Sequence, residues 1–152
     1  MRSTVRMVQP STAVRGLIAG ALAGMGTLHF VPRAARGMAA IVPPAMRDRP
    51  LSAKRLVQLT GACELAGAAG LLLPPTRRAA GAALVVFFVA VFPANAYAAR
   101  HPDRFGPLAV PFWPRLAGQV GIAALTAYGA FGGRGEAGGR RSGSAKTGVT
   151  PC

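Results

Sequence analysis

The chain has 152 residues, a formal net charge of +14 and a hydrophobic fraction of 51%. This length suits one domain, and four helices with their loops use all but roughly 20 residues, so a separate cofactor-binding soluble domain is excluded. The 18 basic residues lie almost wholly outside four apolar stretches. There they can pair with anionic lipid headgroups, so the charge indicates a lipid bilayer as the partner and not nucleic acid.

Four almost uncharged stretches predict transmembrane helices. They span about residues 14–31, 56–74, 79–99 and 115–133. Crossing the hydrocarbon core takes roughly 20 apolar residues, a length that these stretches approach or reach. A soluble bundle would show a polar stripe along each helix, whereas Val85–Val91 is apolar on every side. We therefore predict an all-α integral membrane four-helix bundle over residues 13–133.

The two ends of the chain differ from this bundle. Residues 1–12 form a short tail whose arginines precede an apolar run, as in a signal peptide, but three further spans follow and no clear cleavage site does. Residues 134–152 are rich in Gly, Ser, Lys and Arg and are expected to be a disordered basic tail. Basic residues are equally numerous on both sides of the membrane, so the positive-inside rule does not decide the orientation. The short turn at 74–78 and the basic tail favour a cytoplasmic location for both termini.

Two patterns of small residues predict helix contacts. Gly16, Gly20 and Gly24 in the first span form overlapping small-xxx-small repeats, which predict a close-packing seam. In the second span, one helix face combines three small residues with a carboxyl group: Gly61, Glu64, Gly67 and Ala68. This pattern predicts that the carboxyl group points into the bundle.

Each predicted span carries one strongly polar side chain. In chain order these are His29, Glu64, Asn95 and Gln119. Such a group is costly in lipid unless it faces a partner or a water-filled cavity. Because successive helices run in opposite directions, all four residues lie within about 12 Å of one membrane face at 1.5 Å per residue. They are predicted to form one polar cluster, which is the candidate cofactor-binding site.

Glu64 and His29 are the candidate catalytic pair, as a hypothetical proton relay. Each residue of the cluster also has a structural interpretation. His29 and Gln119 could be ordinary interfacial residues, and Asn95 could satisfy a backbone carbonyl freed by Pro93. Glu64 could be a protonated carboxyl group that hydrogen-bonds across helices. These alternatives stay open at the level of the sequence.

Other chemical signatures are scarce. Cys63 has no CxxC partner, so a thiol–disulfide relay lacks its second cysteine. His29, His101 and Glu64 are too few and too scattered for a recognisable metal or haem site. No metal and no intrinsic cofactor are therefore predicted.

The longest connection, residues 32–55, lies on the same membrane face as the polar cluster. Its apolar residues recur at roughly helical spacing among several arginines, and Pro43 and Pro44 then end the pattern. This arrangement predicts a short interfacial helix that caps the cluster as a lid, with a solvated loop as the alternative.

Several short motifs together resemble a known family. They are GTLHF at 26–30, IVPP at 41–44, CELAG at 63–67, FPANAY at 92–97 and the segment 115–119. In this order they resemble DoxX-type four-helix membrane proteins over about residues 13–131. The resemblance implies a membrane subunit linked to quinone-dependent oxidoreduction, with relatives that are similar to partners in complexes handling thiols and oxidative stress. The added soluble domain of the sulfur-oxidising relatives is missing.

Three functions follow as hypotheses. The first is a redox-associated subunit of the bacterial plasma membrane, in which the polar cluster binds a quinone headgroup or relays its protons while a partner oxidoreductase subunit supplies electrons. Such a protein would be an accessory subunit more than an autonomous enzyme. The second is a non-catalytic membrane scaffold, and the third is a small proton-coupled transporter. The sequence leaves the substrate, the partner and the oligomeric state undecided.

Overall fold

The computed structural model describes residues 9–47, 50–105 and 110–132, which form six α-helices and one 3₁₀ turn, with no strand among them. The helices are α1 (Pro10–Leu28), α2 (Pro32–Ala40), α3 (Ala53–Leu72), α4 (Arg77–Ala99), α5 (Pro102–Phe105) and α6 (Phe112–Phe131), and the 3₁₀ turn is η1 (Pro44–Met46). The predicted all-α class is confirmed. The predicted disordered tail at 134–152 lies outside the described residues.

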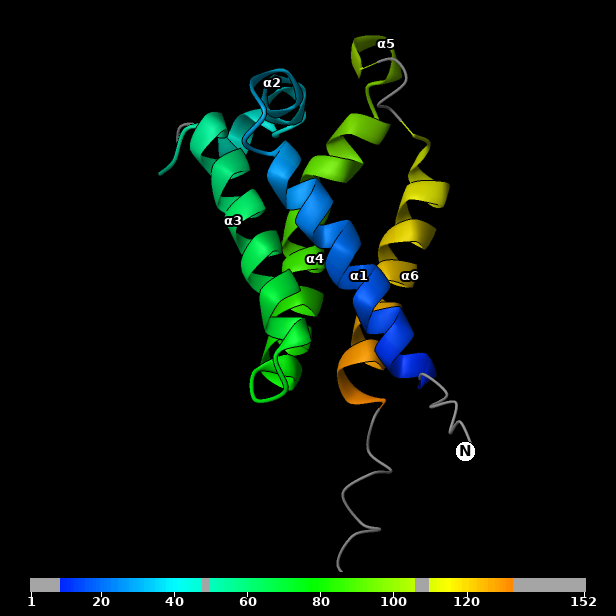
Figure 1. The fold of residues 1–152 in the computed structure, drawn as a ribbon. Helices are drawn as coiled ribbons and strands as arrows, with labels where there is room; N and C mark the ends of the chain where they lie inside the picture. Colours follow the sequence, from blue (N-terminus) through cyan, green and yellow to red (C-terminus); the bar gives the residue numbers. More distant parts are fainter. Residues whose placement is uncertain (1–8, 48–49, 106–109, 133–152) are drawn as a thin grey trace, which may run out of the picture.

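Four long helices form an antiparallel bundle (Figure 1). α1 packs against α3 and α6, and α4 packs against the same two helices, so the four helices form a ring. The short helices α2 and α5 lie at one end of this bundle, called here the α2 end. The first turn of α1 and the last turn of α6 lie at the opposite end, called here the terminal end (Figure 1).

The long helices coincide with the four stretches predicted from hydropathy, with small shifts at their ends. α1 begins at Pro10, three residues before the predicted start of the bundle at residue 13. Proline is favoured in the first turn of a helix because its missing N–H would have no partner there. At the start of α3, the Ser52 side chain accepts a hydrogen bond from the backbone N–H of Arg55 at 3.4 Å and caps the helix.

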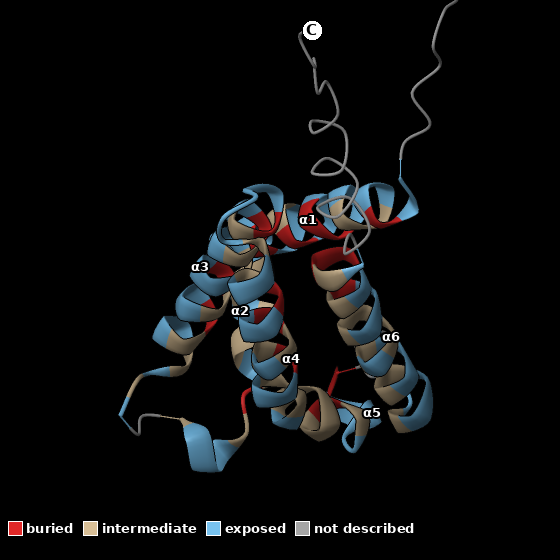
Figure 2. Ribbon diagram, turned by 90° about the horizontal axis from the view of Figure 1, so that it is seen from below, coloured by how far each residue is buried: buried red, intermediate tan, exposed pale blue. Residues whose placement is uncertain are grey.

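The apolar core occupies the half of the bundle nearest the terminal end. Its buried members are Ile18, Ala19, Leu22, Ala68, Leu71, Leu84, Phe88 and Ala130. They come from the middle of α1, the second half of α3, the first half and the middle of α4, and the end of α6. Buried residues line the inner faces of the helices, and exposed residues lie outside (Figure 2). The half nearest the α2 end is packed less tightly and contains the cavity described below.

The glycine seam predicted on α1 is wrong. A Cβ atom added at Gly16, Gly20 or Gly24 would meet nothing within 4 Å, so these glycines face away from the other helices. The close approach of α1 and α3 occurs instead at Gly26 and Gly61, where an added Cβ would lie 3.0 Å and 2.8 Å, respectively, from the carbonyl oxygen of the facing glycine. The repeat pattern correctly indicates that the three glycines share one face of α1. Whether that face points toward the other helices or away from them depends on tertiary packing.

The small-residue face predicted on α3 is confirmed. Gly61 and Ala68 are buried, and a Cβ atom added at Gly67 would lie 2.5 Å from Cδ2 of Leu84 on α4. The same face carries Glu64, whose side chain is 13% exposed. The carboxyl group therefore points into the bundle, as the sequence predicts.

Among the described residues, α4 is the one helix that is by itself long and apolar enough to cross a membrane. Its most apolar 18 residues have a mean hydropathy of 2.0, and 17% of them are buried. α1 and α2 pass the same test as a pair, but they meet at an angle of 92°. α3 and α6 contain charged, amide, hydroxyl and glycine residues that lower their mean hydropathy.

Thr126 on α6 provides a first prediction about stability. It is 1% exposed, and its hydroxyl has no hydrogen-bond partner. A buried unpaired hydroxyl costs about 1–3 kcal/mol, so Thr126→Val, which keeps the shape, should raise the free energy of unfolding by about 1 kcal/mol. Unfolding of the purified protein by dodecyl sulfate in mixed micelles measures this change. Thr27→Val is the control, because the Thr27 hydroxyl is exposed and donates to the carbonyl oxygen of Ala23 at 2.7 Å. Equal effects of the two substitutions would refute the prediction.

Candidate functional site

A cavity of about 640 Å³ lies inside the bundle toward the α2 end. All four polar residues predicted to cluster line this cavity: His29, Glu64, Asn95 and Gln119. They come from four different helices: His29 caps the end of α1, Glu64 lies in the middle of α3, Asn95 lies near the end of α4 and Gln119 lies in the first half of α6. The antiparallel order of the helices therefore brings together residues that are far apart in the sequence.

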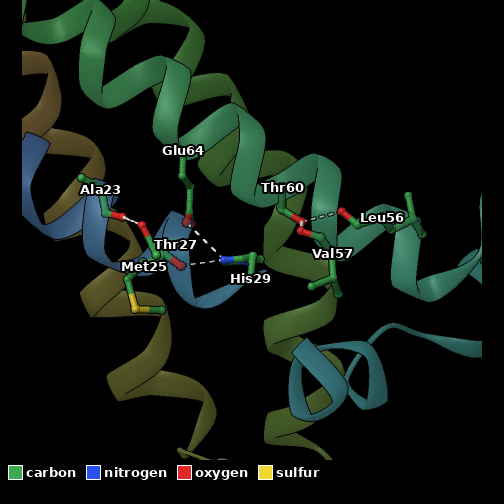
Figure 3. Close-up of polar contacts among 8 residues, drawn as sticks. All are labelled: Ala23, Met25, Thr27, His29, Leu56, Val57, Thr60 and Glu64. Atoms are coloured by element: carbon green, nitrogen blue, oxygen red, sulfur yellow. Dashed lines mark hydrogen bonds and ion pairs between the residues drawn. The ribbon is translucent and has the colours of Figure 1, made fainter. Parts of the chain in front are cut away.

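His29 and Glu64 face each other across the contact between α1 and α3 (Figure 3). The Nδ1 atom of His29 lies 3.4 Å from Oε2 of Glu64 and 2.8 Å from the carbonyl oxygen of Met25. The two side chains are 10% and 13% exposed. The shorter contact assigns a proton to Nδ1, which donates to the Met25 carbonyl oxygen, and leaves Nε2 as an acceptor in the neutral ring.

The glycine contact between α1 and α3 fixes this pair. A Cβ atom added at Gly61 would lie 2.5 Å from Cβ of His29, and one added at Gly26 would lie 3.2 Å from Cβ of Glu64. The absence of both side chains lets the helix backbones approach closely at the level of the two polar residues. The His29–Glu64 separation is thus a direct result of the sequence at these two glycines.

Asn95 and Gln119 are held by the contact between α4 and α6. Nη1 of Arg115 donates to Oδ1 of Asn95 at 2.7 Å, and Nε2 of Gln119 donates to the carbonyl oxygen of Phe88 at 2.7 Å. Gln119 therefore donates to a backbone carbonyl of α4 near Pro93, although the carbonyl that the proline leaves without its helical partner is that of Val89. Asn95 instead presents its oxygen to Arg115.

Arg115 is a site residue that sequence reasoning missed. It lies in the first turn of α6, half-buried, and lines the cavity beside Asn95. Its position at the edge of a predicted span made it look like one more basic residue flanking the membrane. A usable signal was present, because Arg115 and Gln119 are four residues apart and so share one helix face.

Apolar residues form the rest of the cavity wall. Phe87, Phe88 and Val91 contribute from α4, and Met38 and Ile41 contribute from α2 and the residue that follows it. Thr60 also lines the cavity, but its hydroxyl donates to the carbonyl oxygens of its own helix at 2.6 Å and 3.0 Å (Figure 3). The cavity therefore has apolar walls and a limited set of polar groups.

The short helix predicted in the long connection is confirmed as α2. α2 packs against α3 and lines one side of the cavity. The chain after α2 is fastened by Arg47, whose Nε donates to the carbonyl oxygen of Val42 and whose Nη2 donates to that of Ala40, both at 2.8 Å. α2 and the turn that follows it thus form a defined wall of the cavity and not a solvated loop.

The donor set of the cavity suits an organic ligand. In the described part of the chain, no group of three or more His, Cys, Asp or Glu side chains could hold a metal ion. Oε2 of Glu64 is buried without a hydrogen-bond partner, and Nε2 of a neutral His29 is an acceptor. Arg115 and Gln119 contribute donor groups on the other side. Such a site can receive a proton or a hydrogen bond from a bound molecule and can donate one to it.

The fold and site define the protein as a helical bundle with an internal cavity that is apolar along its walls and polar where four helices meet. The chain belongs to DUF8561, a family described as a domain of unknown function, whose model matches residues 18–128. No curated protein and no solved structure matches the chain.

The resemblance to DoxX-type proteins is therefore wrong. The family match over 18–128 covers the same bundle and assigns it to DUF8561. The motifs behind the resemblance are short runs of Gly, Ala and Pro around single polar residues. Closely packed apolar helices need small residues at their contacts and a few buried polar groups, so such runs are not specific to one family.

Proposed function

We propose that the protein is a multi-pass membrane protein that binds a quinone headgroup in this cavity and serves as an accessory subunit of a membrane oxidoreductase complex. The observation that carries the proposal is the cavity itself. It combines the His29–Glu64 pair, the Asn95–Arg115 pair and Gln119 within apolar walls. The fold and this donor set support the proposal without any family resemblance.

Membrane embedding of the four long helices is supported by their outer surfaces. Large apolar side chains on these helices point outward with 58% to 74% exposure: Leu17, Leu72, Val86, Val89 and Val120. Each of the four long helices carries at least one of these side chains, and lipid tails can cover all of them. We propose that the four long helices span a bacterial plasma membrane and that both termini of the chain lie in the cytoplasm.

A quinone fits the cavity by its chemistry. Its isoprenoid chain is apolar and suits contacts with Phe87, Phe88 and Val91, while its ring has two oxygens at opposite edges that exchange hydrogen bonds. In the reduced form the hydroxyl groups donate, which suits Glu64 and His29 as acceptors. In the oxidised form the carbonyl oxygens accept, which suits the donor groups of Arg115 and Gln119.

The side chains can act on protons but not on electrons. Oxidation of a quinol releases two protons and two electrons; Glu64 and His29 can receive protons from the ring hydroxyls, and the electrons pass to the redox centre of a partner subunit. The reverse reaction runs with the opposite transfers. This division of labour is the reason for proposing an accessory subunit.

A transport pathway is less well supported than a binding site. The apolar core, with Leu22, Leu71 and Leu84 among its members, fills the terminal half of the bundle. Ions or polar substrates that entered from the α2 end would meet this apolar core among the described residues. A cavity closed at one end suits retention of a ligand more than passage through the membrane.

Filling the cavity tests the proposal. Val91→Trp introduces a large side chain at a cavity-lining position and should weaken binding of decylubiquinone about tenfold or more, because the ligand and the indole ring compete for the same volume. Val89→Trp, on the same helix at a position that is 70% exposed, is the matched control and should leave binding unchanged. Calorimetric titration of the protein in phosphatidylcholine nanodiscs measures both affinities. No binding by the wild type, or equal losses in both variants, would refute the proposal.

A further inference from the structure

The terminal end of the bundle brings basic side chains together without a nearby acid. Arg15 lies in α1, and Arg77 and Arg78 begin α4. In the part of the chain that the structure describes, the acidic residues are Glu64 and Asp103. Glu64 lines the cavity, and Asp103 lies in α5 at the α2 end. The arginines at the terminal end therefore have no described carboxylate beside them.

Arg15 is held between α1 and α6. Its Nη1 donates to the carbonyl oxygen of Gly129 and its Nη2 donates to Oγ1 of Thr12, both at 3.3 Å. A Cβ atom added at Gly129 would lie 3.2 Å from Cα of Arg15, so the two helices touch at this point. The guanidinium group is thus fixed beside the end of α6 by two long hydrogen bonds to neutral acceptors.

Arg77 reaches the same place from α4. It lies one turn before Gly81, where an added Cβ would collide with Cβ of Ala130 on α6, next to the residue that contacts Arg15. Arg77 and Arg15 lie within electrostatic reach of each other as like charges. The Nε atom of Arg77 is buried and has no hydrogen-bond partner. Arg15 from α1 and Arg77 from α4 therefore both lie beside the end of α6, and Arg77 has an unused buried donor.

The start of α4 adds to the positive potential. Its first turn contains no acidic residue, and the Thr76 side chain does not cap it. The Thr76 hydroxyl donates instead to the carbonyl oxygen of Gly70 at 3.0 Å. The backbone N–H of Arg77 donates to the carbonyl oxygen of Leu73 at 3.0 Å, and the positive end of the α4 dipole lies beside the arginines with no acidic residue in the first turn.

We infer that Arg15 and Arg77 form a binding site for a phosphate group carried by an anionic phospholipid. Phosphate oxygens accept hydrogen bonds from guanidinium groups in a geometry that satisfies several donors at once, and the charge would relieve the repulsion between the two arginines. The lipid as the source of the phosphate rests on the proposed membrane embedding. The phosphate chemistry itself depends only on the arginine pair.

Lipid retention tests this inference with a matched pair of variants. Arg77→Gln removes the residue with the unused buried donor, and Arg78→Gln removes the same charge from the next, exposed residue. Protein from nanodiscs of phosphatidylcholine with added phosphatidylglycerol is examined by native mass spectrometry. Retention of phosphatidylglycerol should fall about tenfold in Arg77→Gln, because charge-assisted hydrogen bonds are among the strong ones. Retention should stay near the wild-type level in Arg78→Gln.

Further arms separate the possible results. In one outcome, inorganic phosphate stabilises the wild type but not Arg77→Gln, while neither protein retains phosphatidylglycerol selectively. That result would assign the site to free phosphate and overturn the assignment to a phospholipid. Equal losses in the two variants, or no preference for phosphatidylglycerol over phosphatidylcholine, would overturn the site. If Arg77→Gln does not fold, Arg77→Lys replaces it and should lose retention about threefold, since the ammonium group keeps the charge without the planar fork.

The outcome is independent of quinone binding. Arg77 lies at the terminal end, away from the cavity, so Arg77→Gln should bind decylubiquinone as the wild type does. A protein that retains phosphatidylglycerol selectively but binds no quinone would support this site and refute the proposed function. A protein that binds quinone but does not retain phosphatidylglycerol selectively would support the proposed function and refute this site.

Discussion

Glu64→Gln should weaken binding of decylubiquinol by about tenfold to a hundredfold while leaving the affinity for oxidised decylubiquinone nearly unchanged, as expected for loss of one charge-assisted hydrogen bond. The hydroxyl groups of the quinol need an acceptor, and the carboxylate of Glu64 is the strongest one in the cavity. The oxidised ring needs donors, which the amide group of glutamine also offers. The substitution should therefore change the preference for one redox state over the other. Titration of the nanodisc-embedded protein with each form measures this ratio.

The structure indicates that Glu64→Gln preserves the fold. Oε2 of Glu64 has no hydrogen-bond partner, and His29 keeps its hydrogen bond to the carbonyl oxygen of Met25. Asp103→Asn, which makes the same chemical change in α5, is the control and should affect neither affinity. A loss of quinol and quinone binding to the same degree in Glu64→Gln would show that the carboxylate does not read the redox state of the ring.

Gly61→Ala should lower the free energy of unfolding by about 2 kcal/mol, a typical cost of an extra methyl group in a tightly packed contact. The added Cβ would lie 2.5 Å from Cβ of His29 and 2.8 Å from the carbonyl oxygen of Gly26. Atoms attached this closely to a helix backbone cannot move aside, so α1 and α3 must separate. His29 would then move away from Glu64, and quinol binding should weaken with stability. Unfolding by dodecyl sulfate and calorimetric titration measure the two effects.

The matched control for this prediction is Gly20→Ala. The substitution is chemically identical and lies within α1, but an added Cβ there meets nothing within 4 Å. Because alanine favours a helix over glycine by roughly 0.5–1 kcal/mol, Gly20→Ala should be neutral or slightly stabilising. Similar destabilisation by both variants would mean that the Gly26–Gly61 contact does not limit the approach of α1 and α3.

The sequence contained enough information to group the candidate residues but not to orient every helix. The depth of each polar residue along its span, together with alternating helix direction, placed His29, Glu64, Asn95 and Gln119 together, and the structure has them around one cavity. Depth depends only on the count of residues and the rise of a helix. The function of the cluster stays a proposal.

Rotation about the helix axis was harder to predict. The stripe of small residues on α3 faces its neighbours as expected, whereas the stripe on α1 faces outward. Both stripes look alike in the sequence, because glycine spacing does not say which side of a helix meets a partner. Arg115 was not predicted as a site residue for a related reason. Its hydrogen bond to Asn95 depends on the rotation of α6 about its own axis relative to α4.

Hydropathy predicted the positions of the four long helices. It did not predict how many of them meet the length and composition criterion for a membrane span. α4 meets that criterion by itself, and α1 does so only together with α2. The polar residues that make the cavity interesting are the ones that lower the hydropathy of α3 and α6. A helical bundle that carries polar groups around an internal cavity therefore weakens its own hydropathy signal.

The corner between α1 and α2 has a mechanical consequence. α1 and α2 meet at 92°, and His29 is the capping residue at the end of α1, just before that corner. α2 also forms one wall of the cavity. A change in the corner angle would move the α2 wall of the cavity and would also turn the imidazole ring of His29. Under the proposed function, the shape of the ligand cavity and the alignment of its proton acceptor are therefore coupled through His29, Phe30 and Val31, the three residues between α1 and α2.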